Sequence, residues 1–216
     1  MPLKIDFHVH TCYSNDCSTS LRDVIIYSKK KGLDGVVITD HDTVEGALKL
    51  QENNNDEIII IPGIEVSTKA GHILGINVMT PIPRGLTVKE TVEKIHEAGG
   101  ISIAAHPFAM YKNGIGFSRK LASQGIDAIE VINSSAFPFF LLNFLSRRLA
   151  YRTKLPQTGG SDAHYPEIIG LAYTVIGGVD VNSEIEEIIR AVKKGLSVPR
   201  GKPVPWKLRL RKISRK

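Results

Sequence analysis

The chain has 216 residues, of which 42% are hydrophobic and 23% are charged, and this composition is typical of one soluble globular domain. No apolar run approaches the roughly 20 residues that a membrane-spanning helix needs, so no membrane partner is expected. No signal peptide is visible, which predicts a cytoplasmic protein. With only Cys12 and Cys17, the sequence excludes a disulfide framework and a zinc site built from four cysteines.

The net charge of +6 is concentrated at the C-terminal end. Residues 200–216 hold eight basic residues and no acidic one, and removing these eight from the 28 basic residues leaves 20 against 22 acidic residues elsewhere. The sequence therefore predicts a domain over residues 1–199 and a basic C-terminal tail from Arg200 to Lys216. Such a tail can bind nucleic acid or an acidic partner, and it can equally be a solvated chain end.

Short β-branched runs alternate with amphipathic segments along the chain. Strands are expected at residues 3–8, 35–39, 58–62, 73–79, 101–105, 127–132, 156–158 and 172–176. Helices are expected at 20–31, 43–52, 88–98, 138–154 and 182–194, with N-caps at Ser20, Asp42 and Thr87. Repeated βα units predict an α/β fold with a parallel sheet inside the helices, closed into a distorted barrel; a doubly wound open sheet is the alternative.

Histidines and carboxylates gather at the ends of the expected strands. Because the carboxyl ends of parallel barrel strands share one rim, these residues would meet in space. His8 and His10 point to the same face of one strand, and Asp6 on that face is a candidate partner that orients an imidazole. The candidates on later strands are His41, Glu65, His106, Asp162 and His164. This mixture of imidazoles and carboxylates predicts a divalent-metal site.

His72 lies at the start of its expected strand. Only residues 66–71 separate it from the preceding strand and Glu65, which is too short for a parallel crossover and predicts a hairpin. An antiparallel hairpin returns His72 to the rim and makes the barrel irregular. His96 lies inside an expected helix, and we interpret it as structural.

Five motifs together resemble the polymerase and histidinol phosphatase (PHP) family. They are HVHT at 8–11 followed by Ser14 and Asp16, TDHD at 39–42, PGIEV at 62–66, AHP at 105–107 and GGSDAH at 159–164. The match runs from about residue 4 to residue 170 in the family's order. The resemblance implies a distorted seven-stranded β/α barrel, TIM-like and of PHP type, with two or three divalent cations.

The resemblance also implies nine metal-binding residues in three overlapping sets. The sets are His8, His10, Glu65 and Asp162; Asp16, His41 and His164; and His72 and His106 with Glu65 as a bridge. Asp162, His164 and His106 are the expected catalytic residues. Zinc, manganese or iron fits these ligands better than calcium or magnesium.

The expected activity is that of a metal-dependent phosphoesterase that hydrolyses a small phosphomonoester with a cation-activated water. A basic side chain should hold the other ester oxygens, and the candidates are Lys112, Arg119, Arg147 and Arg148. Asn133 is a further substrate-binding candidate, and with Glu130 it matches a family strand near the site.

Two other functions stay open. One is a nuclease or 3′-end-processing enzyme that uses the basic tail, although an aromatic content of 6% argues against a stacking platform for single strands. The other is a non-catalytic RNA-binding barrel subunit. The complete set of metal-binding residues argues against this subunit, because buried polar groups without a partner are costly.

Overall fold

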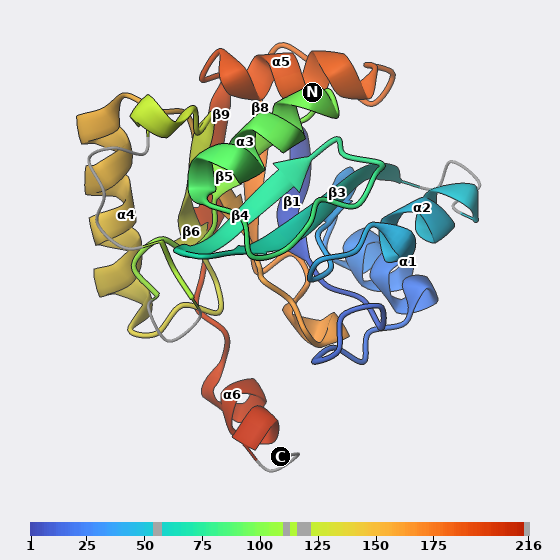
Figure 1. Ribbon diagram of the computed structural model, residues 1–216. Helices are drawn as coiled ribbons and strands as arrows, with labels where there is room; N and C mark the ends of the chain where they lie inside the picture. Colours follow the sequence, from blue (N-terminus) through green and yellow to red (C-terminus); the bar gives the residue numbers. More distant parts are fainter. Residues whose placement is uncertain (54–57, 110–112, 116–121, 214–216) are drawn as a thin grey trace.

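The computed structural model describes residues 1–53, 58–109, 113–115 and 122–213, without the side chains of residues 122 and 211–213. In this part of the chain, nine strands form one sheet in the order β7-β6-β5-β4-β3-β2-β1-β8-β9 (Figure 1). The strands are β1 (Leu3–Val9), β2 (Gly35–Ile38), β3 (Ile59–Thr68), β4 (Gly71–Ile76), β5 (Ile101–Ala104), β6 (Ala128–Asn133), β7 (Gln157–Gly160), β8 (Ala172–Ile176) and β9 (Ser197–Gly201).

The sheet curls into a nearly closed barrel, as the sequence predicts. β1, β2 and β3 are parallel, and so are β5, β6 and β7, so the carboxyl ends of these six strands share one rim. Beyond β7 the chain returns to β1: the Asp162 N–H donates to the His8 carbonyl (2.8 Å), and the His10 N–H donates to the Ala163 carbonyl (3.1 Å). The strand count exceeds the expected seven because β8 and β9 continue the sheet as antiparallel neighbours beside β1.

β3 and β4 form the antiparallel hairpin that the sequence predicts. Ser67 pairs with His72 and Thr68 with Gly71, and Gly71 takes a φ of 134° that favours glycine. β4 also pairs antiparallel with β5. The start of β4 therefore lies at the same rim as the end of the parallel strands, and His72 reaches Glu65 across the hairpin.

Helices lie outside the barrel (Figure 1). Their bounds are α1 (Leu21–Lys30), α2 (Glu45–Glu52), α3 (Val88–Glu97), α4 (Phe139–Thr153), α5 (Ile185–Lys193) and α6 (Trp206–Ile213). α2 packs against β3, α3 against β4 and β5, and α4 against β6. Within the described residues, no helix is long and apolar enough to cross a membrane.

The helix starts test the predicted N-caps. The Ser20 hydroxyl accepts the Asp23 N–H (3.1 Å), and Thr87 forms a full capping box, so both predictions are confirmed. The prediction for Asp42 is wrong. Its backbone takes a φ of 56° and its carboxylate accepts the Ser67 N–H (2.8 Å), so α2 begins later and Val44 is its N-cap.

The predicted basic tail contains two elements of the fold. β9 pairs with β8 as far as Gly201, so the predicted boundary at residue 200 falls inside a strand. Val204 is buried after this strand, and α6 follows beyond the carboxyl rim of the barrel (Figure 1). The separate role of residues 200–216 as a tail stays a prediction.

Candidate metal centre

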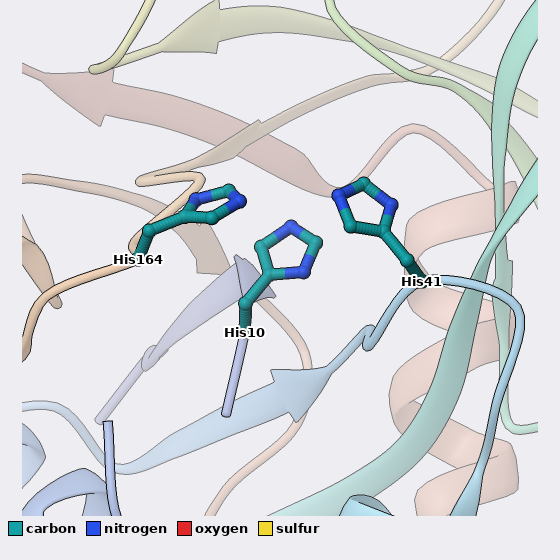
Figure 2. Close-up of side chains that lie close together, drawn as sticks. All are labelled: His10, His41 and His164. Carbon is teal, nitrogen blue, oxygen red and sulfur yellow. The ribbon is translucent and has the colours of Figure 1, made fainter. Parts of the chain in front are cut away.

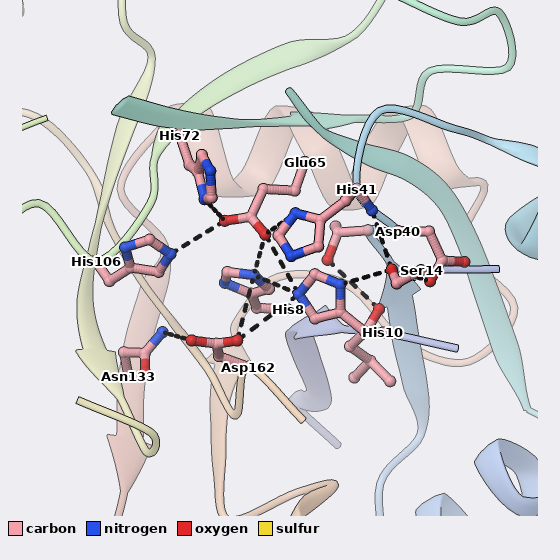
Figure 3. Close-up of polar contacts among 12 residues, drawn as sticks. His8, His10, Ser14, Asp40, His41, Glu65, His72, His106, Asn133 and Asp162 are labelled. Carbon is pink, nitrogen blue, oxygen red and sulfur yellow. Dashed lines mark hydrogen bonds and ion pairs between the residues drawn. The ribbon is translucent and has the colours of Figure 1, made fainter. Parts of the chain in front are cut away.

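The nine predicted metal-binding residues come together at the carboxyl rim of the barrel. Figure 3 shows this cluster apart from Asp16 and His164. His8 and His72 lie in strands, and His10, His41 and His106 follow the ends of β1, β2 and β5. The remaining four are Asp16, Glu65, Asp162 and His164. All are buried except His41, which is partly exposed, and Asp16, which is exposed.

Glu65 lies at the centre of this cluster and contacts five imidazoles. Its Oε2 lies 3.4 Å from His8 Nε2, 3.3 Å from His10 Nε2 and 3.1 Å from His41 Nδ1. Its Oε1 lies 3.0 Å from both His72 Nδ1 and His106 Nε2. One carboxylate therefore contacts residues of all three predicted ligand sets, and its bridging of cations stays a prediction.

The rings of His10, His41 and His164 lie close together (Figure 2). The ring centroid of His10 lies 4.6 Å from that of His41 and 4.2 Å from that of His164. Asp16 joins them from the loop after β1, with Oδ2 3.0 Å from His164 Nε2 and Oδ1 3.7 Å from His41 Nε2. Asp16 is thus the solvent-exposed member of the second predicted set.

The hydrogen bonds of His8 and His10 direct their Nε2 atoms at the cluster. A carboxylate only accepts, so His8 Nδ1–H donates to Glu130 (3.0 Å), and Nε2 is the atom that can bind a cation when the ring is neutral. The Ser14 hydroxyl donates to Asp40 (2.7 Å), so its oxygen accepts from His10 Nδ1–H (3.1 Å). The two Nε2 atoms then face each other at 3.2 Å. When both rings are neutral, two opposed lone pairs repel each other unless both bind a cation.

The donor set fits divalent cations. Four groups of three residues place a ligand atom from each within 4.8 Å of the others: His8, His10 and Asp162; His10, His41 and His164; His8, Glu65 and His106; and His41, Glu65 and His72. The buried His106 Nδ1 has no hydrogen-bond partner among the described residues. Imidazole and carboxylate ligands suit zinc, manganese or iron.

Charge within the cluster also suits cation binding. Burial alone would raise the pKa of Glu65, but the neighbouring imidazoles, with His8 the strongest, hold it well below the usual 4.5. Burial lowers the pKa of His10 well below 6.5, and His164 lowers it further. An ionised Glu65 and a neutral His10 are the protonation states that metal ligation requires. Although burial opposes it, Glu130 and Glu65 raise the pKa of His8 well above 6.5, so a cation that binds His8 must displace a proton.

Two residues of the rim hold uncommon backbone conformations. Asp162 has a φ of 53° and His106 a φ of 27°, in the left-handed region that costs about 1 kcal/mol or more for a residue other than glycine. The His106 N–H donates to the Glu130 carboxylate (2.8 Å), which supports this turn. Surrounding contacts therefore keep both side chains aimed at the cluster.

A second layer of polar residues orients the cluster. Glu130 accepts from His8, His106 and the Asn133 amide (3.0 Å), and Asn133 also donates to Asp162 Oδ2 (3.2 Å). Asn133 is 1% exposed, and its side-chain NH₂ group donates to the carboxylates of Glu130 and Asp162. The structure thus places this predicted substrate-binding residue behind Asp162.

Asp40 is a further residue of this layer, and its role was not expected from the sequence. Its carboxylate accepts the Thr11 N–H and hydroxyl (both 2.7 Å) and the Ser14 hydroxyl, and Ser14 in turn accepts the His41 N–H (3.0 Å). Asp40 therefore ties the loop after β1 to the end of β2. Its place directly before His41 in the TDHD motif is the only sequence signal for this role.

Asp6 was expected to orient an imidazole, and this prediction is wrong. Its carboxylate accepts the backbone N–H groups of His8 (3.2 Å), Ser161 (2.8 Å) and Gly170 (2.9 Å). Burial raises the pKa of Asp6 to about 6 despite these bonds. Asp6 joins β1 to the connection between β7 and β8, while Glu130 contacts the His8 ring.

The structure does not bring the described basic candidates to the cluster. Arg147 and Arg148 are exposed on α4, and Arg148 lies over the Phe144 ring. Arg147 lines a cavity of 490 Å³ beside Gln157, the first residue of β7, so this cavity lies toward the other end of the barrel. Lys112 and Arg119 lie outside the described residues.

Sequence comparisons place related chains in an archaeon. A family model described as PHP-associated matches residues 141–196. An uncharacterized protein of Methanocaldococcus jannaschii is 35% identical over 145 residues, which cover 61% of this chain and 82% of the relative. A second uncharacterized protein of that organism is 28% identical over 185 residues, covering 79% of this chain and 69% of the relative.

Solved structures share the fold at low sequence identity. A two-domain protein of Bacteroides vulgatus, described as containing a "predicted PHP-like metal-dependent phosphoesterase", has a TM-score of 0.78 at 18% identity, over 100% of this chain and 70% of that one. PsfC of Pseudomonas syringae has a TM-score of 0.75 at 18% identity, over 99% of this chain and 97% of PsfC. The lesion-specific endonuclease PfuEndoQ of Pyrococcus furiosus has a TM-score of 0.64 at 20% identity, over 90% of this chain and 56% of the endonuclease. The motifs, the barrel and these similarities together show that the chain belongs to the PHP family.

Proposed function

We propose that this protein is a metal-dependent phosphoesterase that hydrolyses a small phosphomonoester. The observation that carries the proposal is the set of imidazole and carboxylate atoms that converge on Glu65 at the rim of the barrel. The phosphoesterase description of the Bacteroides vulgatus protein, which shares the fold, supports the same reaction class.

The nine residues of the cluster would hold two or three divalent cations. When bound, such cations offset the negative charge of a phosphate ester and lower the pKa of a water at the site toward neutrality. The side chains of this chain need only orient the reactants and move protons. Attack by a water requires no covalent nucleophile from the protein. Ser161 is also not available as one, because it is fully buried and its hydroxyl donates to the His8 carbonyl (3.4 Å).

Asp162 and His164 are the proposed groups that orient the attacking water and accept its proton. Asp162 Oδ1 lies 3.4 Å from His164 Nδ1, and this nitrogen donates to the Asp162 backbone carbonyl (3.2 Å), so the two side chains are held side by side. His106 is proposed to donate a proton to the leaving oxygen. Its Nε2 contacts Glu65 (3.0 Å), while its Nδ1 has no hydrogen-bond partner among the described residues.

The first test combines metal content and turnover. The protein, purified without chelator, should contain zinc, manganese or iron, and should release inorganic phosphate from at least one member of a panel of small phosphomonoesters. Asp162→Ala should lower this turnover by more than about 100-fold, because it removes a proposed ligand as well as a catalytic carboxylate. Asp180→Ala, which removes a carboxylate near α5 at the other end of the barrel, should leave turnover unchanged.

A nuclease is the second candidate, because PfuEndoQ has the same fold and is described as a lesion-specific endonuclease. The basic segment beyond β9 is the feature of this chain that favours a nucleic-acid substrate. Oligonucleotides assayed beside the small esters separate the two activities. Metal-dependent cleavage of oligonucleotides alone would replace the phosphomonoesterase proposal, and correctly folded protein that binds no transition metal would refute both.

A further inference from the structure

The C-terminal segment returns to the rim that carries the metal centre. After β9, the Val204 N–H donates to the Ser134 carbonyl (3.1 Å), just beyond the end of β6. α6 then begins at Trp206, whose ring lies edge-on to Phe137 with a centroid distance of 5.4 Å. Figure 1 shows α6 beyond this end of the barrel, away from α5. The segment therefore packs against the loop that follows β6.

Arg209 in α6 binds the backbone of this loop. Its Nη2 donates to the carbonyls of Ser134 (3.1 Å) and Ala136 (3.2 Å), and its Nη1 donates to that of Ser135 (3.2 Å). Its Nε donates to the Val204 carbonyl (3.2 Å). One planar guanidinium thus holds three successive carbonyls, a pattern that its fixed fork of donors allows and that a lysine ammonium cannot reproduce.

The same loop also forms hydrogen bonds with the backbone and side chain of Asp162. The Ser135 hydroxyl shares its proton between the carbonyls of Ser161 (3.2 Å) and Asp162 (3.1 Å). The Ser135 N–H donates to the Asn133 side-chain oxygen (3.0 Å), which leaves the Asn133 amide to donate to Asp162 Oδ2. Asp162 needs this support, because its left-handed backbone is unfavourable unless neighbouring contacts hold it.

We propose that Arg209 is a positioning residue of the metal centre, which acts through the Asn133–Ala136 loop to hold Asp162 in its ligating conformation. This inference rests on the proposed function, because it assumes that Asp162 binds a cation. It gives part of the basic C-terminal segment a structural task within the site. A basic residue that only attracts phosphate would need no contact with three carbonyls of one loop.

The test compares three variants. Arg209→Ala removes all four hydrogen bonds, and Arg209→Lys keeps the positive charge but not the planar fork. Lys207→Ala is the matched control, because it removes one positive charge from an exposed position of the same helix. Each variant is titrated with Mn²⁺ in competition with a chelator, and the kcat and KM for a turned-over phosphomonoester are measured. Thermal unfolding checks that each variant is folded.

Arg209→Ala should weaken the tightest Mn²⁺ affinity and lower kcat, each by about tenfold, the lower end of the usual cost of losing a residue that orients a ligand. KM should change little. Arg209→Lys should recover less than half of the loss in Mn²⁺ affinity and in kcat, measured on a logarithmic scale. Lys207→Ala should have the Mn²⁺ affinity and kcat of the wild type.

Three results would overturn the inference. The first is an unchanged Mn²⁺ affinity in Arg209→Ala. The second is full rescue by Arg209→Lys, and the third is a salt-dependent rise in KM alone; either of these two would mean that Arg209 acts only through its charge. The proposed function fails separately, since it fails only when the wild-type protein binds no metal or hydrolyses no phosphomonoester.

Discussion

Glu130 connects three parts of the rim, and its charge controls which nitrogen of His8 carries a proton. Oε1 accepts from His8 Nδ1 (3.0 Å), and Oε2 accepts from the His106 N–H (2.8 Å) and the Asn133 amide (3.0 Å). The side chain is 1% exposed, so no bulk water can replace a lost contact. Glu130→Gln is therefore a small change in volume with a defined electronic consequence.

The glutamine keeps only one oxygen for these three donors. If that oxygen stays with His106 and Asn133, the new NH₂ group faces His8 Nδ1, which must then accept a hydrogen bond. The His8 proton moves to Nε2, the atom that faces the cluster, and a protonated nitrogen cannot bind a cation. We expect the affinity for the cation at His8 to fall by about 10- to 100-fold, which corresponds to about 1.4–2.7 kcal/mol.

Competition between the protein and a chelator of known affinity measures this loss with Zn²⁺ or Mn²⁺. Glu93→Gln is the matched control, because Glu93 is exposed on α3, where it pairs with the exposed Lys89 (3.7 Å). A Glu130→Gln protein that is folded and binds both metals as tightly as the wild type would refute the reasoning. It would show that the Glu130 contact does not set the protonation of His8.

Two further predictions concern stability. A methyl group added by Gly160→Ala would meet the His8 Cβ and lie 2.8 Å from the His8 backbone nitrogen, so β7 must move away from β1. Urea unfolding should show that the free energy of unfolding falls by about 1–3 kcal/mol. In the control Gly177→Ala, the added methyl group has its nearest atom at 3.9 Å, so stability should change by less than about 0.5 kcal/mol. Equal effects of the two substitutions would contradict the close approach of β7 to β1. Asp127 is partly buried, and although burial opposes ionisation, its hydrogen bonds with Ser102 and its contacts with His96 and Lys193 hold the pKa below 3.8. The stability that the ionised Asp127 contributes is therefore complete above its pKa in the unfolded chain. It is lost as the pH falls through the lower pKa that Asp127 has in the folded protein. Asp127→Asn should cost about 1–2 kcal/mol at neutral pH and less as the pH falls below about 4; the same cost at both pH values would exclude the charge as the cause.

Strand periodicity and strand direction were sufficient to predict most of the candidate site. His8 and His10 share a face because side chains alternate along a strand, and parallel strands bring His41, His106 and Asp162 to one rim. The short connection before His72 required a hairpin. These inferences need only local geometry and the direction of each chain segment, both of which follow from residue order.

Contacts between distant loops could not be predicted in the same way. Nothing in the local pattern shows that Glu130 faces His8, that Asp6 binds backbone instead of an imidazole, or that Arg209 reaches the Ser134–Ala136 carbonyls. These contacts depend on how loops and chain ends pack after the barrel has closed. The amino-acid order by itself determined which side chains gather at the rim, whereas only the tertiary structure decided which groups hold them in place, because orientation depends on neighbours remote along the chain.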